Sequence, residues 1–274
     1  MRTSFITPRA SLASSRRCLA AALSLGVALS AGCAFDSEVA DRTAVDVIVD
    51  SSAIVTSETD MGYRVELSRC RMAIDGIQFT TDGEQHASLM GPVIDLLIPT
   101  AHAHPGHYGG GEVVGELAER RVFDWRADGT VLGEAILLDA EYTGANFGFT
   151  RARVEDGVHP DDPIVGHTFQ IEGTATLDDE RWEFSILLDQ DEGRRVVGLP
   201  LSLDVDPSVD DALVLAMELH VDDPVERESL FDGIDFAVLD EDGDHVVVLE
   251  PGSDAYNRLR RNTQGHAHYG VSPR

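Results

Sequence analysis

Residues Thr168–Leu188 read TFQIEGTATLDDERWEFSILL, and this segment decides the fold class. Apolar residues alternate with polar ones on both sides of an acidic turn, at Phe169, Ile171, Ala175 and Leu177 and then at Trp182, Phe184, Ile186 and Leu188. A period of two residues indicates a strand with one buried face. Two such runs around a short polar turn predict a β-hairpin.

The same alternation recurs earlier in the chain. Val45, Val47 and Val49 alternate with their neighbours, which predicts a strand. The segment Tyr63–Thr80 alternates in three pieces separated by two phase slips, after Leu67 and after Ile74. Slips of this kind indicate a β-bulge or a bend.

The C-terminal third adds further strands and little helix. Leu213–Val221 alternates as a strand, and Phe236–Leu239 with His245–Leu249 predicts a second hairpin. Only Glu228–Asp232 and Asp254–Asn262 have the pattern of short helices. We therefore expect an all-β fold, an antiparallel β-sandwich with one or two short helices near the C-terminus. With no break in composition, residues 44–274 are expected to form a single domain.

The N-terminus has the features of an export signal. Four arginines precede the apolar run Cys18–Ala31, which is too short to span a bilayer. The run ends in Leu29-Ser30-Ala31-Gly32-Cys33, which resembles a bacterial lipobox. We expect residues 1–32 to be a lipoprotein signal peptide. Cys33 is then expected to carry the lipid, which includes palmitate, and residues 33–43 to form a tether between the lipid and the folded domain. Ordinary cleavage near Ala31 is the alternative.

The composition limits the partners. After loss of the signal peptide and lipidation of Cys33, Cys70 is the remaining thiol, so no internal disulfide is expected. The chain has no lysine, and removal of the signal leaves 17 arginines against 49 acidic residues, a net charge of −32. Such a surface repels nucleic acid and attracts cations. For the overall charge, however, the favoured explanation is a GC-rich genome in a salty habitat, which implies no specific partner. The localisation expected is the cell envelope, with the lipid in the outer membrane on its periplasmic or cell-surface face.

Two histidine clusters indicate a metal. Half of the ten histidines lie in Ala101–Gly109 and Gly265–Gly270, and they are His102, His104, His107, His266 and His268. Two histidines separated by one residue on extended backbone point to the same side, and imidazole is the commonest protein ligand of borderline metals. Three imidazoles suit copper, zinc or nickel, and affinity favours copper. We expect the first cluster to bind one ion, with a site shared by both clusters as the extended form of this hypothesis; solvated loops that bind nothing are the alternative.

Other motifs offer less. There is no nucleophile elbow, phosphate loop or His-Glu-x-x-His helix, so no enzyme activity is expected. A zinc hydrolase that uses Glu112 or Glu116 as its base is the least favoured hypothesis. The acidic run Asp240–Asp244 has calcium-loop spacing without the distal bidentate glutamate. We expect an exposed hairpin tip there, with weak calcium binding as the alternative.

A family resemblance can now be stated, and four stretches carry it: Tyr63–Ile77, His102–Gly111, Phe169–Ala175 and Leu230–Phe236. Together they resemble uncharacterised bacterial lipoproteins related, more distantly, to the MbnP-like periplasmic proteins, whose founding group is associated with copper and methanobactin operons. The resemblance implies a β-sandwich and favours copper over zinc, and it assigns no ligands. The expected function is capture or delivery of a transition metal by a membrane-anchored lipoprotein. A structural or adhesive envelope lipoprotein without a tight metal site is the alternative, and a protein partner is left open.

Overall fold

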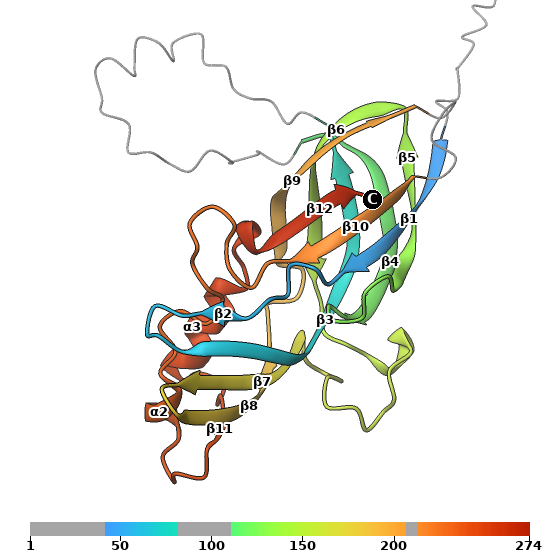
Figure 1. The fold of residues 1–274 in the computed structure, drawn as a ribbon. Helices are drawn as coiled ribbons and strands as arrows, with labels where there is room; N and C mark the ends of the chain where they lie inside the picture. The colour runs from blue at the N-terminus through green and yellow to red at the C-terminus, as the bar shows by residue number, and fades with distance from the viewer. Residues whose placement is uncertain (1–41, 82–110, 207–212) are drawn as a thin grey trace, which may run out of the picture. The chain divides into compact units, whose positions relative to one another are not determined.

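The computed structural model describes residues 42–81, 111–206 and 213–274. These residues are mostly β-strand with two short helices near the C-terminus, which confirms the all-β class (Figure 1). Within these ranges, no helix is long and apolar enough to cross a membrane. The elements are β1 (Arg42–Asp50), β2 (Ser57–Glu58), β3 (Arg64–Thr80), β4 (Val113–Asp124), β5 (Val131–Leu138), β6 (Ala140–Phe149), η1 (Val154–Asp156), β7 (Phe169–Leu177), β8 (Glu180–Leu188), β9 (Arg195–Val205), β10 (Val214–Leu219), α2 (Phe236–Leu239), β11 (Val246–Val248), α3 (Asp254–Asn262), η2 (His266–His268) and β12 (Tyr269–Pro273).

The described strands form one hydrogen-bonded sheet in place of the two separate sheets of a simple sandwich. Its main path runs β11-β8-β7-β3-β4-β5-β1-β10-β12, and β6 pairs with both β3 and β9. Most pairs are antiparallel, but β1 with β10 and β11 with β8 are parallel. The sheet curls, so that β12 lies against β9 (Figure 1). The inward faces thereby enclose a common core.

Strand β3 is shared by the two parts of this sheet, the part that contains β7 and β8 and the part that contains β4 and β6. Its first half pairs with β7, and its second half pairs with β4 and β6. The register shifts between Leu67 and Arg69 and between Asp75 and Ile77, where the sequence predicted its two phase slips. At the second shift Gly76 has φ +74°, and a Cβ there would lie 2.7 Å from the carbonyl oxygen of Leu117. Only glycine fits this bulge.

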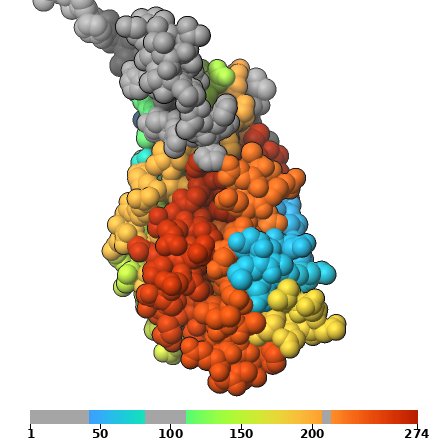
Figure 2. Space-filling view, turned by 90° about the vertical axis from the view of Figure 1, so that its left-hand side faces the viewer, coloured from blue at the N-terminus to red at the C-terminus, as the bar shows by residue number. Residues whose placement is uncertain are grey.

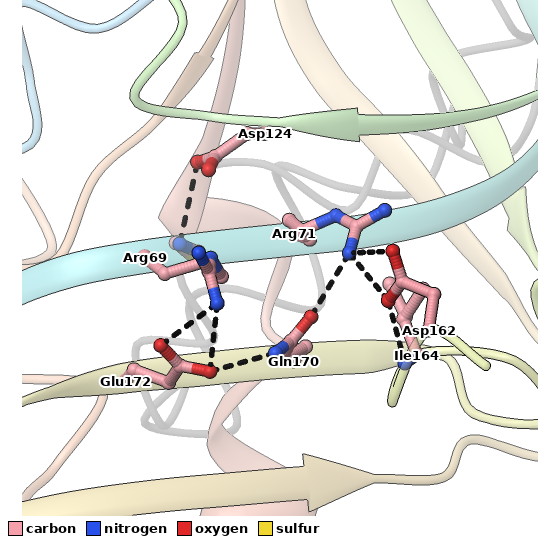
Figure 3. Close-up of polar contacts among 8 residues, drawn as sticks. Arg69, Arg71, Asp124, Asp162, Ile164, Gln170 and Glu172 are labelled. Atoms are coloured by element: carbon pink, nitrogen blue, oxygen red, sulfur yellow. Dashed lines mark hydrogen bonds and ion pairs between the residues drawn. The ribbon is translucent and has the colours of Figure 1, made fainter. Parts of the chain in front are cut away.

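The β7–β8 hairpin is confirmed, and it packs closely against β3. A Cβ on Gly173 would lie 2.4 Å from the carbonyl oxygen of Glu66, so the two strands need a glycine at this point. Side chains on β3 and β7 also pair across the strands (Figure 3). Arg71 Nη1 donates to both carboxylate oxygens of Asp162, at 2.7 and 2.8 Å, and to Gln170 Oε1 at 3.1 Å.

The core is continuous and contains two groups of aromatic rings. One group packs between the β7–β8 hairpin and the segment that leads into α2, and its rings are Tyr63, Trp182, Phe184, Phe231 and Phe236. The other lies under β12, and its rings are Phe123, Trp125, Phe147, Phe149, Phe169 and Tyr269. Burial of this many apolar side chains stabilises the fold, and Cys70, the cysteine within the described ranges, is free.

Two local predictions were wrong. Phe236–Leu239 is the helix α2, so no second hairpin forms, and β11 instead pairs in parallel with β8. Asp235 caps the helix by accepting a hydrogen bond from the N–H of Val238, and Phe236 is fully buried. Glu228–Asp232 is not a helix: Ser229 forms an isolated bridge with Asp222, and a turn follows. A short apolar run does not by itself distinguish strand from helix.

Candidate functional site

The predicted site residues divide into two groups. His102, His104, His107 and the predicted lipidation site Cys33 lie outside the described residues. His266 and His268 are described, and they form the short 3₁₀ turn η2 between α3 and β12. The second cluster can therefore be examined in detail.

His268 is buried and held in one orientation. The side chain is 6% exposed, and Nδ1 lies 3.0 Å from the carbonyl oxygen of His220. Because a carbonyl can only accept a hydrogen bond, Nδ1 carries the proton and Nε2 carries the lone pair. Burial lowers the pKa of His268, which keeps the ring neutral.

The position of this turn follows from its neighbours. The backbone N–H of His220 donates to the carbonyl oxygen of His268 at 2.9 Å, so the two residues bind each other in both directions. Tyr269, the first residue of β12, is buried, and its hydroxyl donates to the carbonyl oxygen of Thr263 at 2.8 Å. The end of α3 and the start of β12 are thereby fixed together.

The backbone of the second histidine cluster differs from the one that the sequence pattern assumed. Two histidines separated by one residue point to the same side only on extended backbone. Residues 266–268 instead form a 3₁₀ turn, with about three residues per turn. Side chains two positions apart then point about 120° away from each other. His266 is also half-buried whereas His268 is buried. The extended backbone assumed for His266 and His268 is therefore wrong, whereas their binding of a metal stays a prediction.

A cavity of about 750 Å³ lies beside η2, and both His266 and His268 line it. Its other walls are the end of α3, the segment 223–232 and Asp60. Figure 2 shows this face, where the red residues of α3 and η2 lie beside the orange residues that follow β10. Two cationic residues line the cavity, Arg258 and Arg261, against five acidic ones: Asp60, Asp223, Glu226, Glu228 and Asp232.

Hydrogen bonds hold the acidic wall in place. Asp232 accepts from the backbone N–H groups of Asp60 and Ser229, both at 2.8 Å, and Gly233 N–H donates to Asp60 Oδ1 at 2.7 Å. Asn262 Nδ2 on α3 donates to the carbonyl oxygen of Leu230 at 2.9 Å. The cavity is therefore bounded by segments that are bonded to one another.

On the neighbouring strands, a second polar group surrounds His220. His220 Nε2 lies 3.5 Å from Glu218 Oε2, and Glu218 Oε1 accepts from the Ser272 hydroxyl at 2.7 Å. A Cβ on Gly270 would lie 3.0 Å from His220 Nε2, so glycine leaves room for the imidazole. The alternation of this strand had placed Glu218 and His220 on one face. The role of the His220 carbonyl in orienting His268 could not be read from side-chain patterns.

Among the described residues, the potential metal ligands that gather in a group of three are Asp240, Asp242 and Asp244. His220, His266 and His268 form no such group with one another or with the acidic wall in the part of the chain that the structure describes. A metal at His268 would therefore need further ligands from elsewhere.

No family model matches the chain, and no curated protein matches it. Among solved structures, the fold has a distant likeness to MbnP from Methylosinus trichosporium, with 12% sequence identity and a TM-score of 0.30. The match covers 85% of this chain and 98% of MbnP. A likeness of this size is too distant to transfer a function to this chain.

Proposed function

We propose that this chain is an exported, lipid-anchored protein that binds a transition metal, copper in preference to zinc, for capture or delivery. The ligands are His102, His104 and His107, joined by His268. The protein acts as a binding protein and not as an enzyme.

The observation that carries this proposal is the state of His268. A metal-binding histidine usually donates its second ring N–H to a carbonyl or a carboxylate, which fixes the tautomer and the ring orientation. His268 has this arrangement, with Nδ1 bonded to the His220 carbonyl and Nε2 free of a proton. The buried neutral ring needs no deprotonation before it binds a cation.

The surroundings favour a cation. The five acidic residues of the cavity outnumber its two arginines, and the whole chain has a net charge of −28. An acidic concave surface concentrates cations near it. One imidazole cannot hold copper or zinc tightly, so the histidine-rich segment His102–His107 supplies the remaining ligands in this proposal.

The test is a competition titration of copper and zinc against a chromophoric chelator. Four proteins are compared: the wild type, His268→Asn, His266→Ala and His159→Ala. Asparagine keeps a donor for the His220 carbonyl but removes the imidazole nitrogen. His159 has an exposed side chain and serves as the matched control.

We expect His268→Asn to weaken binding at least about tenfold, because loss of a ligand costs no less than loss of a residue that only orients one. His159→Ala should bind as the wild type does, and His266→Ala shows whether the second histidine of the cluster contributes. Equal affinity of His268→Asn and the wild type would remove His268 from the site. No tight binding of either metal by the wild type would favour the alternative, a structural or adhesive envelope lipoprotein.

A further inference from the structure

Three aspartates alternate in the segment between α2 and β11, at positions 240, 242 and 244. One carboxylate oxygen of each lies within 4.8 Å of the corresponding oxygens of the other two. Among the described residues, the basic group that comes within 4.0 Å of them is His245, whose Nδ1 lies 3.8 Å from Asp240 Oδ2. Three negative charges are therefore held together with little compensation.

Asp240 differs from the other two because it is buried. Its side chain is 5% exposed, whereas Asp242 and Asp244 are exposed. Asp240 Oδ2 accepts hydrogen bonds from Trp182 Nε1 at 3.1 Å and from the His245 N–H at 3.2 Å. Asp240 Oδ1 is inaccessible to solvent and accepts no hydrogen bond from any residue that the structure describes. A buried carboxylate oxygen without a partner is unfavourable, and a cation bound beside it would remove that cost.

We propose that Asp240, Asp242 and Asp244 bind one calcium ion, with Asp240 Oδ1 as the buried ligand. Oxygens up to 4.8 Å apart fit around an ion with bonds of about 2.3–2.6 Å, because ligands on opposite sides of it are then about 5 Å apart. Three carboxylates suit a hard cation better than copper or zinc, which favour nitrogen or sulfur. Calcium accepts irregular coordination completed by water, whereas magnesium requires a near-ideal octahedron. This site is separate from the histidine site proposed above.

The ion has a structural consequence. Asp240 links the end of α2 to β8 through Trp182, and the same turn leads into the edge strand β11. Neutralising the three carboxylates holds these segments together, so calcium raises the unfolding temperature of the protein. Any ligand that binds only the folded state has this effect.

The experiment is a calorimetric calcium titration of the chelator-treated full chain, with magnesium titrated in parallel. We expect saturable binding of one calcium ion with a Kd of about 10⁻⁴–10⁻³ M, the range of exported modules with few charged ligands. Asp242→Asn/Asp244→Asn should weaken the binding at least tenfold, and the change is compatible with folding because both side chains are exposed.

The matched control is Glu155→Gln/Asp161→Asn in the segment between β6 and β7, where both residues are exposed, which removes two charges in another part of the fold. This control and His268→Asn should both bind calcium as the wild type does. The proposal is overturned by the absence of saturable binding or by full binding in Asp242→Asn/Asp244→Asn. It is also overturned by an equal loss in the control, which would indicate general attraction to an acidic surface.

Discussion

Replacing His268 with alanine should destabilise the protein by about 2 kcal/mol at pH 7.5. The change removes the hydrogen bond from Nδ1 to the His220 carbonyl, worth about 0.5–1.5 kcal/mol. It also removes a buried ring, and deletion of buried atoms adds a further cost for the space they leave. Because His268 lines an existing cavity, water can enter the space that the ring leaves. The loss of unfolding free energy is therefore expected to stay at about 2 kcal/mol, at the low end of the costs known for deleting a large buried side chain.

The same residue makes stability depend on pH. Burial lowers the pKa of His268, so between its folded value and the ordinary value of about 6.5 the unfolded chain binds more protons than the folded chain. The stability that neutral His268 contributes is therefore fully present above about pH 6.5 and is lost as the pH falls toward the folded pKa. Reduced repulsion among the many carboxylates changes stability over the same range, but it does so equally in wild type and variant.

The assay is urea unfolding at pH 7.5 and pH 5.5 for the wild type, His268→Ala and His159→Ala, with free energies from linear extrapolation. We expect the difference in stability between the wild type and His268→Ala to shrink at pH 5.5. His159→Ala, at a side chain that is 76% exposed, should be as stable as the wild type. A cost below 0.5 kcal/mol, or a difference that is the same at both pH values, would refute a buried neutral His268.

Three further outcomes follow from the fold. Gly173→Ala should destabilise the protein by at least about 1–3 kcal/mol, because its Cβ would meet a β3 carbonyl at 2.4 Å. In the same unfolding assay Gly148→Ala, whose Cβ meets ordinary contacts of 3.6 Å, should cost much less. Burial raises the pKa of the Cys70 thiol, so peptide mapping should find Cys70 unmodified by a thiol reagent until urea unfolds the chain. Arg71→Gln should cost about 1 kcal/mol through loss of its two bonds to Asp162, and a smaller loss in 1 M salt would confirm that the pair is ionic.

Much of the sheet could be predicted from the sequence. Period-two alternation located β1, β3, β7, β8 and β10, and the two phase slips of β3 marked two of its register shifts; the shift between Phe79 and Thr80 was not predicted. In β8 and in the first half of β3, buried and exposed residues alternate, which leaves a clear signal in the sequence. The order of the strands and the two parallel pairings depend on contacts between distant segments, and no local pattern contains them.

The errors occurred where the segments were short or irregular. Phe236 is buried by the rings of Tyr63 and Phe184, and those contacts, with the Asp235 cap, select a helix where a four-residue apolar run fits either element. For the candidate metal site, the clustering of histidines in the sequence was the signal that pointed to His266 and His268. Their 3₁₀ backbone, the carbonyl of His220 and the buried oxygen of Asp240 are properties of tertiary structure, so they could not be read from residue types.

The most direct test of the proposed function is the metal content of the purified protein after equilibration with copper and zinc. Elemental analysis would compare the wild type with His102→Ala/His104→Ala. Histidine-based binding predicts one ion per chain, copper in preference to zinc, and its loss in the double variant. An unchanged metal content in the double variant, or no bound ion in the wild type, would contradict it.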